Sequence, residues 1–282
     1  MALLVSAPPS LAARPGALVP VGLQIVGAGL PGTVNPGSSA SVSIDCLAGA
    51  PHPVGGMFNP LGALSQSQLA LSASYPVGKR SWRLEITNLG PVAHEYQAFV
   101  VCVGAPGVKF AYPHASSVIA PGSSRGIAGT CPRRASAPLG GLFYLGGGAP
   151  ANDAVVNWIA LLYRHERLTS RATVGLRSLA SAPVRFTAGI VCSNLPIATP
   201  QARGTLQAGN VSGVTLTCPK GGYAVGGTFF GADPGATSEI TLAASVFDSG
   251  RNYTVKVRSL ATYPQHYLAG AVCVSAWLPS PA

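Results

Sequence analysis

Apolar and polar residues alternate in three similar stretches of this 282-residue chain, WRLEITNLG, ATVGLRSLA and YTVKVRSLA, which begin at Trp82, Ala172 and Tyr253. A period of two, with β-branched and aromatic residues, predicts β-strands. Each stretch is followed by a second alternating or apolar run that contains a cysteine 20 residues after the first stretch begins. These cysteines are Cys102, Cys192 and Cys273. We interpret each pair of runs as a hairpin whose second strand carries the cysteine.

The hairpins belong to a longer repeat. The segments VNPGSSASVSIDC, IAPGSSRGIAGTC and LQAGNVSGVTLTC each place a glycine nine residues before a cysteine, and a glycine pair follows that cysteine. The cysteines are Cys46, Cys131 and Cys218. The glycines are Gly37, Gly122 and Gly209, and the pairs are Gly55–Gly56, Gly140–Gly141 and Gly226–Gly227. We assign all nine glycines to turns of the repeat.

A period of about 85 residues is too long for a solenoid coil and suits one small β-domain. The sequence therefore predicts an all-β protein of three tandem sandwich-like repeats, each with about six short strands. We expect an extended N-terminal arm at residues 1–35 and repeats at 36–106, 107–196 and 197–282. The alternative is a single threefold body, similar to a β-prism, in which the repeats share one core.

Six cysteines allow 15 disulfide connectivities. The repeat favours the local scheme, which joins Cys46 to Cys102, Cys131 to Cys192 and Cys218 to Cys273. We expect the first cysteine on an early strand, the second on the last strand, and the two strands to be neighbours. A zinc site is disfavoured because the chain has no CxxC motif. Disulfides indicate an oxidising destination.

The composition is poor in charge. Only 9% of the residues are Asp, Glu, Lys or Arg, against about 25% in ordinary soluble domains. Gly and Pro contribute 35 and 25 residues, which favours many short strands. No apolar run is long enough for a membrane-spanning helix. The 18 Lys and Arg residues give a net charge of +10, but they are scattered along the sequence, so we expect no specific nucleic-acid partner. The excess could help the protein bind an acidic or glycan surface.

The N-terminus has no basic residue before Arg14, and Pro8 and Pro9 interrupt its apolar run. We interpret it as a docking arm rather than a secretion signal. Disulfides without such a signal fit a virion protein, which is made in the host cytoplasm and oxidised after release. A secreted protein is the alternative.

Residues for catalysis are few. The eight carboxylates do not repeat at equivalent positions, and His94–Glu95 and His165–Glu166 lack the second histidine of an HExxH helix. His266, between aromatic residues, fits a turn. The segment LGGGAPAND lacks the Lys-Ser or Lys-Thr of a phosphate loop. We predict no catalytic residue, metal site or cofactor. The unit-specific segment 155–168 is read either as a long strand or as a short helix.

The best copy of the repeat motif, CPKGGYAVGGTFF at 218–230 followed by AGAVC, resembles a module of bacterial and bacteriophage extracellular and tail-fibre-like proteins. The resemblance implies a structural β-module and carries over no catalytic residue or ligand. We expect a non-enzymatic virion component, either a capsid decoration protein or part of a tail, neck, collar or fibre. Its partners would be other virion proteins or copies of itself. The alternative is a secreted multivalent carbohydrate-binding protein, although Trp82, Ala172 and Tyr253 do not repeat a stacking residue.

Overall fold

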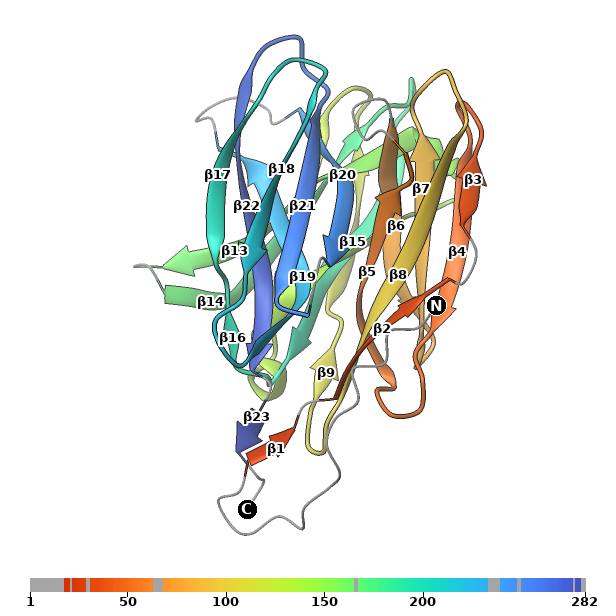
Figure 1. Cartoon of the computed structure of the whole chain (residues 1–282). Helices are drawn as coiled ribbons and strands as arrows, with labels where there is room; N and C mark the ends of the chain where they lie inside the picture. Colours follow the sequence, from red (N-terminus) through yellow and green to blue (C-terminus); the bar gives the residue numbers. More distant parts are fainter. Residues whose placement is uncertain are drawn as a thin grey trace.

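The chain forms an all-β structure, as predicted from the alternating stretches. The computed structural model describes residues 18–20, 22–28, 31–62, 68–164, 167–232, 239–247, 250–275 and 277–279. Within these ranges it contains 23 strands and two short 3-10 helices, η1 (Arg133–Ala135) and η2 (Ala151–Asp153). Most strands run along the long dimension of the body (Figure 1). No helix in the described part is long and apolar enough to cross a bilayer.

The strands of the first unit belong to two antiparallel sheets. They are β2 (Gly22–Gly27), β3 (Gly32–Val34), β4 (Ser39–Asp45), β5 (His52–Pro60), β6 (Leu69–Val77), β7 (Ser81–Asn88) and β8 (His94–Gly104). In one sheet β8 pairs with β2, β3 and β5. In the other sheet β7 lies between β4 and β6.

The second and third units repeat this pairing. The second comprises β9 (Phe110–Ala111), β10 (His114–Ile119), β11 (Ser124–Thr130), β12 (Ala137–Leu145), β13 (Ala154–Arg164), β14 (Arg167–Ser178) and β15 (Val184–Ser193). The third comprises β16 (Ile197–Ala198), β17 (Gln201–Leu206), β18 (Val211–Thr217), β19 (Gly222–Gly231), β20 (Ile240–Phe247), β21 (Asn252–Ser259) and β22 (Gln265–Ser275). In each, the last strand pairs with the first, second and fourth strands, and the sixth strand pairs with the third and fifth.

The three units share sheets and a core. Strand β12 of unit 2 pairs with β6 of unit 1 through Phe143 and Ser74, and β19 of unit 3 pairs with β13 of unit 2 through Phe229 and Ile159. At the third junction β20 packs against β5. One continuous cluster of buried apolar residues includes members of all three units. The units are therefore not separate domains in a row. They form a single threefold body, which was the alternative interpretation.

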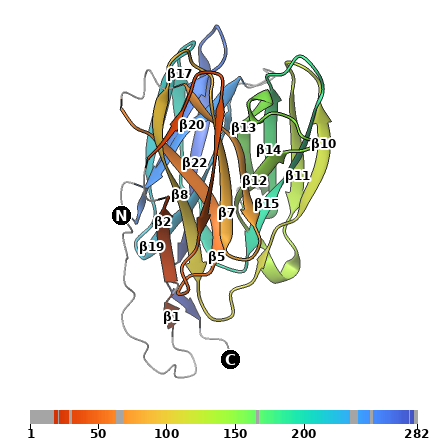
Figure 2. The same cartoon turned by 90° about the vertical axis from the view of Figure 1, so that its right-hand side faces the viewer.

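The expected arm at residues 1–35 needs correction. Residues 22–27 and 32–34 pair with β8 and so belong to the first unit, where they take the place of β9 and β10 in unit 2. These strands were not predicted because they are short and contain glycine, so they show no clear alternation of apolar and polar residues. Strand β1 (Leu18–Pro20) pairs with β23 (Trp277–Pro279) beyond one end of the body (Figure 2). Residues 1–17 lie outside the described ranges.

The predicted turn glycines fall into two groups. Gly37, Gly122 and Gly209 lie in tight turns with φ of 63°, 65° and 68°, a conformation that glycine adopts without steric cost. The glycine pairs are not in turns. They lie inside β5, β12 and β19, where each strand has a bulge directly before the pair. The prediction was wrong for the pairs, because the second glycine of each is required by close packing between sheets and not by a turn.

The described residues of the unit-specific segment at 155–168 are β-strand and not helix. They form most of β13 and the beginning of β14, which make a longer hairpin than their counterparts in the other units. Trp158 on β13 is partly exposed. A Cβ on Gly175 would lie 2.1 Å from its ring, so the indole packs directly over this glycine. The indole Nε1 donates a hydrogen bond of 2.8 Å to Thr173 Oγ1.

Candidate functional site at the disulfide end

All six cysteines form disulfides in the local scheme. The bonds join Cys46 to Cys102, Cys131 to Cys192 and Cys218 to Cys273, over sequence separations of 56, 61 and 55 residues. The two strands of each bridge are not hydrogen-bonded neighbours, contrary to our expectation. Cys46 follows β4, which pairs with β7, whereas Cys102 lies in β8 of the opposite sheet. Each disulfide therefore joins the two sheets of its unit.

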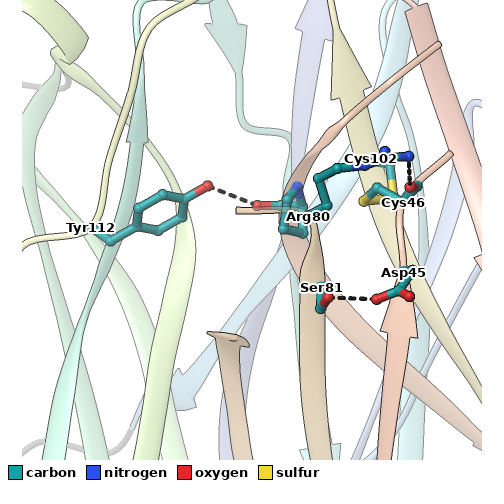
Figure 3. The surroundings of a disulfide bond; sticks show 7 residues. Asp45, Cys46, Arg80, Ser81, Cys102 and Tyr112 are labelled. Atoms are coloured by element: carbon teal, nitrogen blue, oxygen red, sulfur yellow. Dashed lines mark hydrogen bonds between the residues drawn. A yellow bond between two sulfur atoms is a disulfide. The ribbon is translucent and has the colours of Figure 1, made fainter. Parts of the chain in front are cut away.

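In two of the three units, an arginine forms two hydrogen bonds with the first cysteine of the disulfide. In unit 1 the backbone N–H of Cys46 donates to the carbonyl of Arg80, and Nη2 of Arg80 donates to the carbonyl of Cys46 at 2.7 Å (Figure 3). Unit 3 repeats both bonds between Cys218 and Arg251. In unit 2 only the backbone bond from Cys131 to Ser170 is present. These arginines were not among the site residues predicted from the sequence. The sequence pattern that could have indicated them is an arginine two residues before the aromatic residue that begins the alternating stretch, as in RSW and RNY.

The three disulfides lie at one end of the body. Strand β9 starts unit 2 by pairing Ala111 with Cys192, and β16 starts unit 3 by pairing Ala198 with Cys273. The hydroxyl of Tyr112 donates to the carbonyl of Pro53, the residue opposite Cys102 (Figure 3). We call this the disulfide end. The opposite end, which we call the turn end, carries the tight turns at Gly37, Gly122 and Gly209 and the loops between the last two strands of each unit.

Burial shifts the pKa values of several side chains, but these side chains do not lie together in one site. Burial raises the pKa of Tyr112 to about 12. Burial also raises the pKa of Tyr253 to about 12, against a smaller opposing effect of the Ser245 hydroxyl. Burial lowers the pKa of the Arg258 guanidinium. These three groups belong to the packed core and the sheet junctions and do not converge on a cleft.

A small cavity lies where the units meet. It has a volume of about 40 Å³ and is lined by all six residues of the glycine pairs, together with apolar side chains and the hydroxyls of Ser74 and Ser245. A space of this size holds one or two waters and no substrate. The second glycine of each pair makes room for a closely packed side chain: a Cβ on Gly56 would lie 2.6 Å from Trp82, and one on Gly227 would lie 2.2 Å from Tyr253.

The candidate polar pairs do not build a reactive site. His94 and Glu95 open β8, opposite Val34 and Thr33. His165 and Glu166 lie outside the described residues. His266 is on β22, paired with Thr205, and not in a turn as we expected. The described residues contain no group of three His, Cys, Asp or Glu side chains that could hold a metal ion.

No protein-family model and no curated protein matches this chain.

Proposed function

We propose that this protein is a non-enzymatic structural component of an extracellular assembly, in which it acts as a rigid disulfide-stapled block. The assembly that we favour is a virion, with the protein as a capsid decoration protein or as part of a tail, neck, collar or fibre. The observation that carries the proposal is that each unit has one disulfide between its sheets while the units share their sheets. Three cross-links in a fused body restrict the unfolded chain and favour persistence outside the cell.

The low charge supports the same proposal. Chains with few charged residues leave much apolar and neutral surface for contact with other subunits. Strand β18 illustrates this, because it is an outer strand of its sheet and has no charged residue from Val211 to Thr217. An uncharged edge strand can accept a strand from a partner subunit. The expected resemblance of the repeat motif to a module of bacterial and bacteriophage extracellular and tail-fibre-like proteins motivates the choice of a virion.

A carbohydrate-binding protein with three equivalent aromatic sites has less support. Trp82 and Tyr253, the aromatic residues at equivalent positions of units 1 and 3, are 0% and 3% exposed, and Ala172 occupies the position in unit 2. Buried rings cannot stack on a sugar. An arrangement of three identical stacking sites would need aromatic residues elsewhere in the repeat.

The proposal can be tested in a culture of the organism that encodes the chain. Extracellular particles are sedimented and washed, and the protein is quantified in the particle, supernatant and cytosolic fractions. Mass spectrometry without reduction then determines the state of the cysteines. We expect the protein in the particle fraction with three intact disulfides. Recovery in the cytosol with free thiols, or only as a free extracellular protein, would contradict the proposal.

A further inference from the structure

Basic residues that are scattered in the sequence gather at the disulfide end. The eight described Lys and Arg residues at this end are all exposed: Lys79, Arg80, Lys109, Arg133, Arg134, Arg171, Lys220 and Arg251. Each is close to a bridge by contact or by sequence. Arg80 and Arg251 bond the cysteine carbonyls, Arg133 follows Cys131 by two residues, and Lys220 follows Cys218 by two. Lys109 donates its backbone N–H to Asn194, which follows the strand of Cys192.

Acidic side chains are scarce in the same place. Among the described residues, Asp45 is the carboxylate next to a bridge, and it accepts a hydrogen bond from Ser81. All three units contribute cations, so the basic residues surround the end of the threefold body. Elsewhere in the chain the other ten Lys and Arg residues are largely offset by the other seven carboxylates, so most of the net charge of +10 comes from this end.

The turn end has a different balance. Glu95, Asp153 and Glu239 lie there together with Arg125 and Arg185. Glu239 forms an ion pair of 2.7 Å with Arg177. A surface with mixed charge does not complement the disulfide end. Stacking of copies end to end is therefore not favoured by charge, and the partner of the basic end must carry its own excess of negative charge.

We propose that the disulfide end binds an anionic polysaccharide, one with phosphate or sulfate groups, of the kind that covers cell surfaces. Guanidinium groups suit such anions because their planar fork donates two parallel hydrogen bonds. The choice of polysaccharide over nucleic acid rests on the extracellular setting of the proposed function. It is also supported by side-chain chemistry, because among the described side chains the large apolar ones exposed at this end are Leu47 and Val77, which are aliphatic and offer no surface for base stacking.

The test compares two triple variants with the same loss of charge. Arg133→Gln, Arg134→Gln and Lys220→Gln remove three exposed cations from the disulfide end. Arg125→Gln, Arg185→Gln and Arg203→Gln remove three exposed cations elsewhere. The probes are a heparin fragment, a duplex DNA of similar charge and uncharged dextran, with affinities measured by calorimetry at several salt concentrations. Mass spectrometry without reduction and thermal melting confirm that both variants are folded with intact bridges.

We expect heparin binding that weakens with salt and falls about tenfold or more in the disulfide-end variant, against less than about threefold in the control. Equal losses in the two variants would overturn the proposal, because binding would then depend on net charge alone. Tighter binding of DNA than of heparin, or binding of dextran, would also overturn it. The measurement is made on the purified protein, so it can fail while the particle-fraction test succeeds, and the reverse.

Discussion

The indole Nε1 of Trp82 donates a hydrogen bond of 2.9 Å to Oγ of Ser74 in the core of unit 1. The strand registers place Tyr253 and Ser245 at the equivalent positions of unit 3, and Ala172 and Ile159 at those of unit 2. In units 1 and 3 a large aromatic residue at the first position is therefore combined with a serine at the second, whereas in unit 2 a small alanine is combined with a larger isoleucine. This exchange conserves volume in the same site, because interiors are packed to near crystal density.

The first prediction concerns this exchange. Trp82→Ala should lower the free energy of unfolding by about 3–5 kcal/mol, since it opens a cavity and leaves the Ser74 hydroxyl without its donor. Ser74→Ile alone should also destabilise, because the larger side chain would collide with the indole. The double variant, Trp82→Ala with Ser74→Ile, has the alanine and isoleucine found in unit 2. Its loss of stability should be smaller than the sum of the losses in the two single variants. Urea denaturation of the four proteins measures the coupling, and additive losses would show that the two sites are independent.

The second prediction concerns two adjacent glycines of one pair. A Cβ on Gly141 would lie 2.6 Å from Cγ2 of Val174, whereas a Cβ on Gly140 would meet nothing within 4 Å. Gly141→Ala should therefore cost about 1–3 kcal/mol of stability through overpacking. Gly140→Ala is the matched control and should change stability by less than about 1 kcal/mol, with a small gain from the stiffer unfolded chain. Similar losses at both positions would contradict the close packing described for the junction.

The sequence predicted local structure better than it predicted the assembly of the units. The alternation after Trp82 and Tyr253 indicated strands, because one face of each strand is buried and period two records that directly. The disulfide scheme followed from the repeat. The shared sheets could not be predicted, because the contact of Phe143 with the β6 backbone depends on how two distant strands meet. The basic end was missed for the same reason: residues as far apart as Lys79 and Arg251 come to the same end of the body only through the threefold arrangement.

The third prediction is a loss of stability in alkali. Burial raises the pKa of Tyr112 and of Tyr253 from 10.0 to about 12, so the folded protein keeps both phenol protons after the unfolded chain has released them. The stabilisation is therefore complete below pH 10 and is lost as the pH rises from about 10 to about 12. The slope is about 1.4 kcal/mol per pH unit for each tyrosine. Denaturant titrations across this window measure it. Tyr253→Phe should reduce this pH dependence of the free energy of unfolding by the contribution of one tyrosine. An unchanged slope in this variant would contradict the raised pKa of Tyr253.

The fourth prediction follows from bridges placed in shared sheets. Replacement of Cys218 and Cys273 by serine removes a bridge that spans 55 residues, and the chain-entropy model assigns about 4 kcal/mol to a loop of this size. In a row of separate domains only unit 3 would lose stability. Here β19 of unit 3 pairs with β13 of unit 2, and β20 packs against β5 of unit 1. The loss should therefore lower the midpoint of one cooperative transition for the whole chain. In a Trp277→Phe background, tryptophan fluorescence reports on Trp82 and Trp158 in units 1 and 2, and it should shift together with far-UV circular dichroism. A separate early transition in circular dichroism, with the fluorescence transition unchanged, would show that unit 3 unfolds independently.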